Sequence, residues 1–208
     1  MGKATETRTR ILEAAIRMAS SDGFGGVSLA PLAEECAMSK SGLFAHFASK
    51  EDLQVAMLDF AAERFREKVV RPALAMRRGL PRLKAAFGHS LDWAERAALP
   101  GGCLFYAAAA ELDDRPGPVR DRLVQLQREW FASLHRIIAT AVEESDLEPR
   151  LDIDQFVAEM WGILLNHRFA GRLMRDQLAD QRARKAFDRL IRRHRAGARS
   201  TARSRHNA

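Results

Sequence analysis

Apolar residues recur along most of the chain at intervals of three and four, the spacing typical of amphipathic α-helices. Between residues 8 and 20 they share one face, while Arg10, Glu13 and Arg17 fall elsewhere. No stretch shows the period of two that is typical of a strand. We therefore predict an all-α protein with about nine helices.

The first 50 residues contain strong signals for helix ends and helix starts. Three glycines in four positions, from Gly23 to Gly26, end the first helix. Ser28, Ser39 and Ser49 each stand where a capping hydroxyl is expected, and Ser49 precedes two acidic residues. These signals predict two short helices joined by a tight turn, followed by a longer helix.

The second short helix is expected to point its apolar residues Leu43 and Phe47 inward. The side chains then left outside are Lys40, Ser41, Phe44 and His46, while Gly42 gives close access to the backbone and Lys50 stands at the start of the next helix. The order of helix, Gly-rich loop, S-x-x-x-L-A, turn, S-K-S-G-L-F-A-H-F and S-K-E-D-L resembles the DNA-binding domain of the TetR family of transcriptional regulators. The resemblance covers roughly the first 60 residues and implies a three-helix DNA-binding domain with a helix-turn-helix.

The resemblance implies a role for each outward residue. Lys40, Ser41 and Gly42 match base-facing positions, and a second set matches positions that contact the DNA backbone: Ser28, Phe44, His46 and Lys50. The helix starts at Ser28, Ser39 and Ser49 also offer backbone N–H groups to phosphates. Taken one at a time, each of these side chains also fits an ordinary surface or core role.

Four positions depart from the family pattern: Ala30, Pro31, Ala37 and Phe44. Phe44 stands where a tyrosine is usual, so a hydroxyl-to-phosphate bond is absent. Ala37 replaces the usual turn glycine, which costs about 1 kcal/mol if the site is left-handed. Ala30 and Pro31 replace polar residues that sometimes contact phosphates in the family, so we expect the helix that starts at Ser28 to contribute less to DNA affinity.

The net charge of +7 does not by itself indicate DNA binding. From Asp180 to the end of the chain, ten Lys and Arg face two Asp, which gives +8 and leaves −1 for the rest. The basic segment 196–208 is expected to be disordered, either attracting phosphates without specificity or forming a solvated extension. DNA binding must therefore depend on the local arrangement of residues and not on the net charge of the chain.

The remainder of the chain predicts a helical bundle. A helix is expected from Ser49 towards Val70, ended or kinked at Arg71-Pro72, and the apolar segment from Cys103 to Leu112 is expected to be buried on every side. The run G-G-C-L-F-Y-A-A-A-A-E-L-D-D-R-P-G-P-V-R-D resembles a segment of some TetR-type C-terminal domains. We expect a DNA-binding domain over residues 1–48 and a regulatory and dimerisation domain over 49–195.

Two sets of residues in this second domain are candidates for binding. Large or hydrogen-bonding side chains on apolar helices resemble the lining of a mostly apolar ligand cavity, although each also fits a packed core: His89, Trp93, Cys103, Phe105, Tyr106, Trp130, Met160 and Asn166. In the TetR family the last two helices usually form a four-helix dimer interface. Apolar residues available for it here are Phe156, Leu164, Phe169, Leu178 and Leu190.

No spacing points to catalysis, a metal or a cofactor. The carboxylates Glu111, Asp113 and Asp114 do not share one helical face and are expected to form a capped surface loop. Cys36 and Cys103 are expected to be buried thiols, with a redox switch as the alternative. No secretory signal or membrane helix is visible, so we expect a cytoplasmic protein.

The pattern and the resemblance together predict a homodimeric regulator, a repressor by family habit. Its expected partners are a near-palindromic double-stranded operator and an apolar or aromatic small-molecule effector. The alternative is an all-α enzyme or small-molecule carrier that uses the apolar cavity of the C-terminal domain. Turnover that depends on Glu111 or His89 would favour that alternative.

Overall fold

The computed structural model describes residues 2–96 and 102–197 of the chain. Helices make up the fold, and the described residues contain no strand, only an isolated bridge between Leu147 and Arg195. The all-α prediction is confirmed. The chain divides into two compact units, Met1–Glu67 with Trp93–Arg128 (unit 1) and Lys68–Asp92 with Glu129–Ala208 (unit 2).

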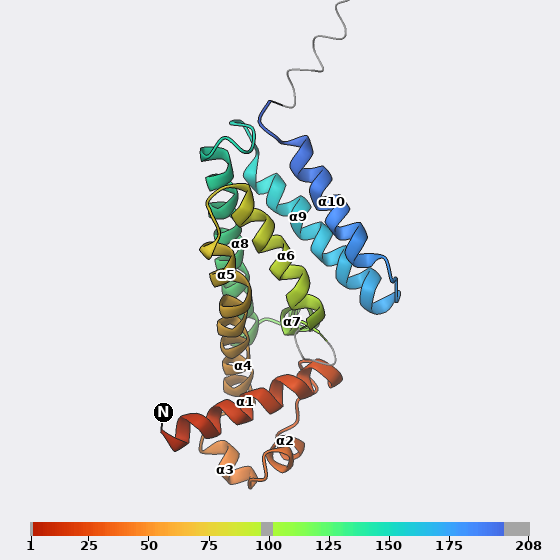
Figure 1. Ribbon diagram of the computed structural model, residues 1–208. Helices are drawn as coiled ribbons and strands as arrows, with labels where there is room; N and C mark the ends of the chain where they lie inside the picture. The colour runs from red at the N-terminus through yellow and green to blue at the C-terminus, as the bar shows by residue number, and fades with distance from the viewer. Residues whose placement is uncertain (1, 97–101, 198–208) are drawn as a thin grey trace, which may run out of the picture. The chain divides into compact units, whose positions relative to one another are not determined.

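Unit 1 contains the N-terminal helices and a later helical segment (Figure 1). Its elements are α1 (Lys3–Asp22), α2 (Leu29–Glu35), α3 (Lys40–Phe44), α4 (Lys50–Phe65), α7 (Leu104–Leu112) and the beginning of α8 (Pro118–Glu143). As predicted, the glycine-rich segment ends α1, with Gly23 at φ 89°. Ile11, Leu53 and Leu104 are buried in one core, which joins α1, α4 and α7.

Unit 2 is a second helical group. Its elements are α5 (Arg71–Ala75), most of α6 (Leu80–Arg96), the end of α8, α9 (Ile153–Arg168) and α10 (Ala179–Arg193). Helices α9 and α10 lie side by side (Figure 1). The rings of Phe87 on α6 and Phe187 on α10 stack with centroids 3.8 Å apart. The side chain of Asp152 accepts the N–H of Gln155 at 3.0 Å and so caps the start of α9.

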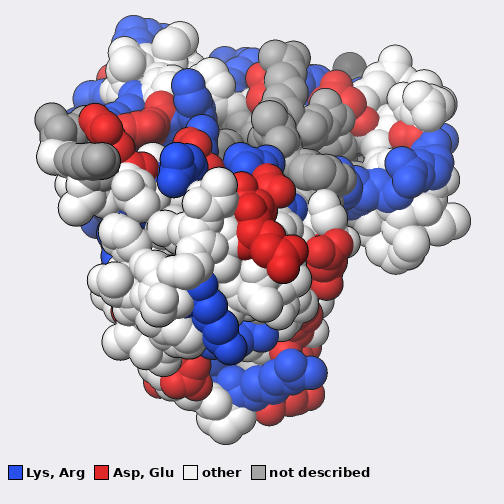
Figure 2. Space-filling view, turned by 90° about the horizontal axis from the view of Figure 1, so that it is seen from below, with Lys and Arg blue, Asp and Glu red and all other residues white. Residues whose placement is uncertain are grey.

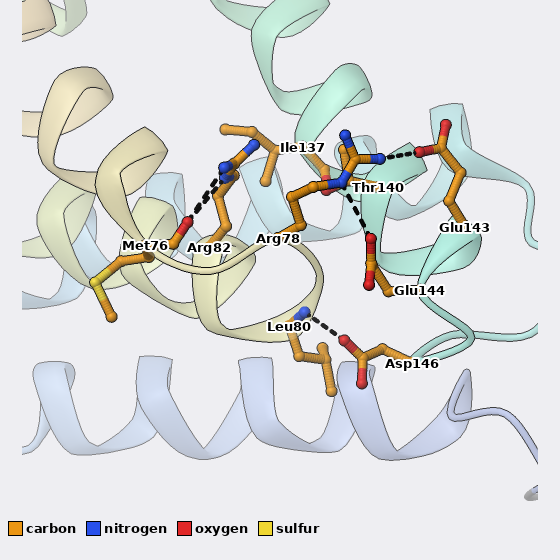
Figure 3. Close-up of polar contacts among 9 residues, drawn as sticks. All are labelled: Met76, Arg78, Leu80, Arg82, Ile137, Thr140, Glu143, Glu144 and Asp146. Atoms are coloured by element: carbon orange, nitrogen blue, oxygen red, sulfur yellow. Dashed lines mark hydrogen bonds and ion pairs between the residues drawn. The ribbon is translucent and has the colours of Figure 1, made fainter.

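A remote carboxylate caps the start of α6. Asp146, beyond the end of α8, accepts the N–H of Leu80 at 2.8 Å, and Gly79 before it has φ 85°. Figure 3 shows this contact beside Arg78, which pairs with Glu143 and Glu144 on the same end of α8. Polar contacts therefore join the loop before α6 to the end of α8.

The helix predicted from Ser49 towards Val70 follows a different course after Phe65. A π-helical turn, Arg66–Val70, follows α4, and α5 then carries the helical backbone past Pro72 to Ala75. Pro72 is tolerated because it lies at the start of α5, where its missing N–H is not needed. The expected disturbance at Arg71-Pro72 is present, but the helical backbone does not end there.

Helix α7 is not buried on every side, contrary to the prediction. Leu104 and Ala108 are buried, whereas Ala109 and Ala110 are exposed. Alanine tolerates either environment, so an apolar composition alone does not fix burial. Of the basic segment 196–208, residues 198–208 lie outside the described part. Among the described residues, none of the helices has the length and apolar character that a bilayer span requires.

Candidate DNA-binding surface

The segment from α2 to α3 is a helix-turn-helix whose helix starts are set by serines. The hydroxyl of Ser39 accepts the N–H of Gly42 at 3.1 Å, and that of Ser49 accepts the N–H of Asp52 at 3.0 Å. Ser28 occupies the cap position of α2, but its side chain makes no capping hydrogen bond. The predicted helix starts are confirmed, and the Ser28 hydroxyl is left for another partner.

The turn between the two helices passes through Ala37 in the left-handed conformation, with φ 50°. The N–H of Met38 donates to the carbonyl of Ala33 at 3.0 Å, which closes the turn. A Cβ atom in this region costs about 1 kcal/mol or more relative to glycine. Ala37 is therefore in the left-handed conformation for which the sequence predicts an energetic cost, and the turn is strained.

Apolar anchors and an arginine of α1 hold this unit in place. Leu43 and Phe47 are buried in the core of unit 1, as predicted. The guanidinium of Arg8 lies over the ring of Phe47, 4.2 Å from its centroid, and donates to the carbonyl of His46. The sequence pattern placed Arg8 at the start of a helix without indicating this contact, because its partners are 38 or more residues away.

The predicted DNA-binding residues lie at the surface of unit 1. Ser28, Ser39, Lys40, Ser41, Phe44 and Lys50 are exposed, and Gly42 and His46 are partly buried. Phe44 is 42% exposed, so it points outward and is not the core aromatic that its residue type would favour. A Cβ at Gly42 would lie 3.3 Å from the Ser39 hydroxyl, so a larger residue there would crowd the cap of α3.

Charge on this surface is mixed. Figure 2 views the molecule from below, the side on which α2 and α3 are drawn in Figure 1, and shows basic and acidic side chains interspersed among uncharged ones. Glu34 and Glu35 are exposed on α2, near in sequence to the exposed Lys40 on α3. The arrangement agrees with the charge count of the sequence, in which the first 50 positions carry six Lys and Arg against five acidic residues.

A carboxylate that the sequence did not assign to this region lies against the glycine-rich loop. Glu111 on α7 accepts the N–H of Phe24 with one oxygen and that of Gly25 with the other, both at 2.6 Å. The sequence pattern had placed Glu111 in a capped surface loop with Asp113 and Asp114. Among the described residues, no group of His, Cys, Asp and Glu is arranged to hold a metal ion.

The predicted ligand-binding residues are distributed over both units. Trp93, Cys103, Phe105 and Tyr106 belong to unit 1, whereas His89, Trp130, Met160 and Asn166 belong to unit 2. Trp130 and Met160 are buried, but Asn166 is exposed at the surface of α9. The four members in unit 2 therefore do not share one environment.

An aromatic group in unit 1 includes two of these residues. The ring of Phe65 on α4 lies edge-on to Trp93, with centroids 5.6 Å apart, and edge-on to Phe105 at 6.4 Å. The indole Nε1 of Trp93 is buried and has no hydrogen-bond partner among the described residues. A buried N–H without an acceptor is uncommon, so this group is a site where an acceptor would be favourable.

Unit 2 contains a hollow of about 440 Å³ on the surface of α8 and α9. None of the predicted ligand-binding residues lines it. Its lining residues are Phe131, Ala132, His135, Arg136, Asp154 and Val157. The imidazole of His135 lies 3.9 Å from the carboxylate of Asp154 across it.

The predicted dimer residues also differ in exposure. Phe156, Leu164 and Leu190 are buried within unit 2, where they contribute to the core of one chain. Phe169 and Leu178 are exposed, at 55% and 48%. Further exposed apolar side chains lie close to them in sequence, namely Leu165, Leu173 and Met174.

Both cysteines are buried thiols without a disulfide. Burial raises the pKa of the Cys36 thiol, and the nearby positive charge of Arg10 opposes this only in part. The thiol is therefore protonated near neutral pH, which favours an inert core role for Cys36 over a redox role.

Two short helices joined by a tight turn, with an exposed second helix, define a helix-turn-helix protein of the DNA-binding class. A family model described as bacterial regulatory proteins, tetR family, matches residues 11–57, and one described as the tetracyclin repressor-like C-terminal domain matches residues 79–187. The second match alone covers more than half of the chain. The protein belongs to the TetR family.

Curated relatives are regulators of the same kind. The chain is 41% identical over 71 residues to the HTH-type transcriptional regulator UidR of Escherichia coli K12, a match that covers 32% of the chain and 36% of UidR. The chain thus spans about a third of the length of this relative. It is 22% identical over 177 residues to the HTH-type transcriptional regulator SrpR of Pseudomonas putida, covering 85% of the chain and 80% of SrpR.

Solved structures share the fold over most of its length. A TetR transcriptional regulator from Chloroflexus aurantiacus is 25% identical with a TM-score of 0.81, covering 92% of this chain and 95% of that one. AibR in complex with isovaleryl coenzyme A and operator DNA is 23% identical with a TM-score of 0.68, covering 87% and 98%. The likeness to AibR shows the shared fold alone.

Proposed function

We propose that the protein is a transcriptional regulator that binds a near-palindromic operator as a homodimer, and that it is a repressor released by a small-molecule effector. The observation that carries the proposal is the outward face of α3, where Lys40 and Ser41 are exposed on a helix whose other face is fixed in a core. Binding to chromosomal DNA requires the protein to act in the cytoplasm, which is therefore part of the proposal.

Recognition of bases is assigned to α3. The major groove of B-DNA admits one helix, and a lysine at the start of that helix can donate to the O6 and N7 atoms of a guanine. Ser41 and Gly42 are small, so the helix backbone can approach the base edges. His46 and Lys50 are assigned to backbone phosphates, whereas Phe44 offers only an apolar edge because it has no hydroxyl.

Dimerisation is assigned to exposed apolar side chains around the end of α9 and the start of α10. This apolar patch consists of Leu165, Phe169, Leu173, Met174 and Leu178. Several large apolar side chains exposed close together in sequence on a water-facing surface indicate a protein interface. A second copy suits the proposal because two recognition helices about 34–36 Å apart would engage both half-sites of a palindrome.

The effector is proposed to be an apolar or aromatic molecule with a hydrogen-bond acceptor. The buried indole N–H of Trp93, beside Phe65 and Phe105, would donate to that acceptor. The complex of AibR with isovaleryl coenzyme A and operator DNA supports the binding of both a small molecule and DNA by a protein of this fold. Release requires the effector to bind the DNA-free state better than the DNA-bound state.

Selection of bound fragments from genomic DNA tests the operator proposal. The purified chain should enrich a near-palindromic sequence, and Lys40→Ala combined with His46→Ala should weaken binding to it at least about 30-fold, or about 2 kcal/mol. Lys84→Ala, at an exposed lysine of α6, is the matched control and should leave affinity unchanged. Equal binding by the double variant would show that α3 does not read this operator.

The dimer proposal is tested by introducing charge into the apolar patch. Phe169→Glu together with Met174→Glu should give monomers in sedimentation velocity and should weaken operator binding in parallel. The matched control is Leu74→Glu, because Leu74 is comparably exposed but lies outside the patch. A dimer that survives both patch substitutions would move the interface elsewhere on the chain.

The effector proposal is tested with a panel of aromatic carboxylic acids and amides, scored by release of fluorescent operator DNA. Trp93→Phe keeps an aromatic ring but removes the donor, so a releasing compound should act about 5–10 fold more weakly on that variant. Compounds that release the wild type and the variant at equal concentrations would exclude the indole N–H as their partner.

A further inference from the structure

The loop between α1 and α2 is held by side chains from two other helices. On one side, Glu111 of α7 accepts the N–H groups of Phe24 and Gly25, both at 2.6 Å. On the other side, Lys50 of α4 donates to the carbonyl of Gly25 at 2.8 Å, and Gln54 donates to that of Phe24 at 3.4 Å. Gly25 is therefore bonded through its N–H to Glu111 and through its carbonyl to Lys50.

The loop is shaped to admit a carboxylate. A Cβ at Gly23 would lie 2.9 Å from Glu111 Oε1, and one at Gly25 would lie 3.0 Å from Oε2, so a side chain at either glycine would push the carboxylate away from the N–H groups. Successive N–H groups that converge on one anion form a concave site with a fixed partial positive charge. Hydrogen bonds to an ionised carboxylate are roughly twice as strong as neutral ones, so this contact fixes the loop firmly.

The ammonium group of Lys50 has N–H donors that the bond to Gly25 does not use. An ammonium group carries three N–H bonds, and the bond to Gly25 uses one of them. The side chain of Lys50 is exposed, so the other two are available to a phosphate oxygen. The carbonyl of Gly25 thus limits the directions in which this ammonium can point.

We propose that Glu111 is a positioning residue for operator binding, which acts through Gly25 on the ammonium of Lys50. The carboxylate fixes the backbone of Gly25, and the Gly25 carbonyl then holds Lys50 in the direction that a phosphate requires. This inference rests on the proposed contact between Lys50 and the DNA backbone. It also gives α7 a role in DNA binding, although α7 lies within the region that the C-terminal domain model matches, residues 79–187.

Glu111→Gln tests the proposal, because an amide offers one acceptor oxygen where the loop presents two donors. Affinity for the selected operator should fall about 5–10 fold, as for the loss of one charge-assisted contact in each half-site. The slope of log affinity against log salt should become shallower by about 1 for each protomer, because one phosphate contact is lost. Asp114→Asn removes the same charge from an exposed neighbour and should change neither quantity.

A double-mutant cycle separates positioning from simple loss of stability. If Glu111 acts through Lys50, Glu111→Gln should have no further effect on affinity in a Lys50→Ala background. Independent, multiplied effects of the two substitutions would overturn the proposal, as would wild-type affinity and salt slope in Glu111→Gln.

Two further measurements keep the test decisive. Should Glu111→Gln fold poorly, Glu111→Asp keeps the charge on a shorter side chain and should give the same loss of affinity with the same dependence on Lys50. Amide exchange of Phe24 and Gly25 in these variants reports the loop contact without DNA, and unchanged protection would also overturn the proposal. Failure of the wild type to select any operator would refute the proposed function, whereas a weakened Lys50→Ala beside an unaffected Glu111→Gln would refute only this inference.

Discussion

The loops before α2 and α6 use the same device in different units. Each contains a glycine with positive φ, 89° at Gly23 and 85° at Gly79, and each is bonded by a carboxylate from a distant part of the chain. At both glycines a Cβ atom would crowd the carboxylate, that of Glu111 or that of Asp146. A left-handed glycine thus brings backbone N–H groups within reach of an acid that no local pattern would pair with them.

The two loops differ in what the carboxylate holds. Asp146 accepts one N–H and acts as the cap of α6, in a region where Arg78 pairs with Glu143 and Glu144 and Arg82 donates to the carbonyl of Met76 (Figure 3). Glu111 accepts two N–H groups of a loop that leads to Ser28 and also contacts Lys50. The same loop geometry therefore stabilises the fold in unit 2, whereas in unit 1 it also holds residues of the candidate DNA-binding surface.

The largest effect is expected from removing the two glycines. Gly23→Ala forces an alanine into φ 89°, ψ 156°, a region almost restricted to glycine, and should lower the free energy of unfolding by about 3 kcal/mol. Gly79→Ala should lower it by a similar amount, because its Cβ would displace the Asp146 cap. Urea unfolding followed by circular dichroism measures both, and a loss below about 0.5 kcal/mol at either site would contradict the steric argument.

The next largest effect distinguishes the role of the Asp146 carboxylate from that of the Glu111 carboxylate. Asp146→Asn should lower the free energy of unfolding by about 1 kcal/mol through a weaker cap of α6, while the folded dimer keeps its affinity for the operator. Glu111→Gln should reduce that affinity as well. Urea unfolding and fluorescence polarisation, carried out on both variants, give the comparison. A loss of operator affinity in Asp146→Asn would abolish the proposed division of roles.

A smaller effect of opposite sign is expected at Ala37, the left-handed position that lacks a glycine. Ala37→Gly relieves the Cβ strain and should raise the free energy of unfolding by about 0.5–1 kcal/mol, after the larger entropy of the unfolded glycine is deducted. Thermal unfolding shows the change as a higher midpoint. Ala45→Gly, at an exposed position with φ −66°, is the matched control and should be neutral or destabilising.

The smallest effect is expected from the ion pairs beside the Asp146 cap. Arg78 pairs with Glu143 and Glu144, but all three side chains are substantially exposed. Exposed pairs of this kind contribute only about 0.2–1 kcal/mol, so Arg78→Ala should lower stability less than Asp146→Asn does. Unfolding at high salt should reduce the difference between Arg78→Ala and the wild type further, because salt screens exposed charges.

Local chemistry explains the parts of the fold that the sequence predicted well. Ser39, Ser49 and Asp152 each bond a backbone N–H three residues ahead, so the signal for the helix start lies within one turn of the residue that carries it. Leu43 and Phe47 were predicted inward from their spacing alone, and both are buried. The helix-turn-helix could be predicted for the same reason, because the residues that define it lie close together in the sequence.

Long-range contacts explain what was missed. Glu111 is 86 and 87 residues from the N–H groups that it accepts, and Asp146 is 66 residues from its own. Neither sequence spacing nor residue type links such partners. Spacing was similarly silent on the predicted dimer residues, of which Phe156 and Leu164 are buried within their own chain whereas Phe169 is exposed. Apolar spacing identifies a helix face but not whether it contacts its own chain or another.

The bond between Glu111 and the glycine loop bears on the construction of chimeric regulators. Replacing residues 1–48 by the corresponding segment of a relative would transfer a complete helix-turn-helix. The recipient would nevertheless keep its own Glu111. The glycine-rich loop of the relative would then lie against Glu111, a carboxylate whose position suits the backbone of a different loop. If Glu111 positions Lys50 as proposed, the segment that must be transferred to keep full DNA affinity consists of two separate stretches of sequence, and Glu111 with its surroundings must be exchanged along with the first.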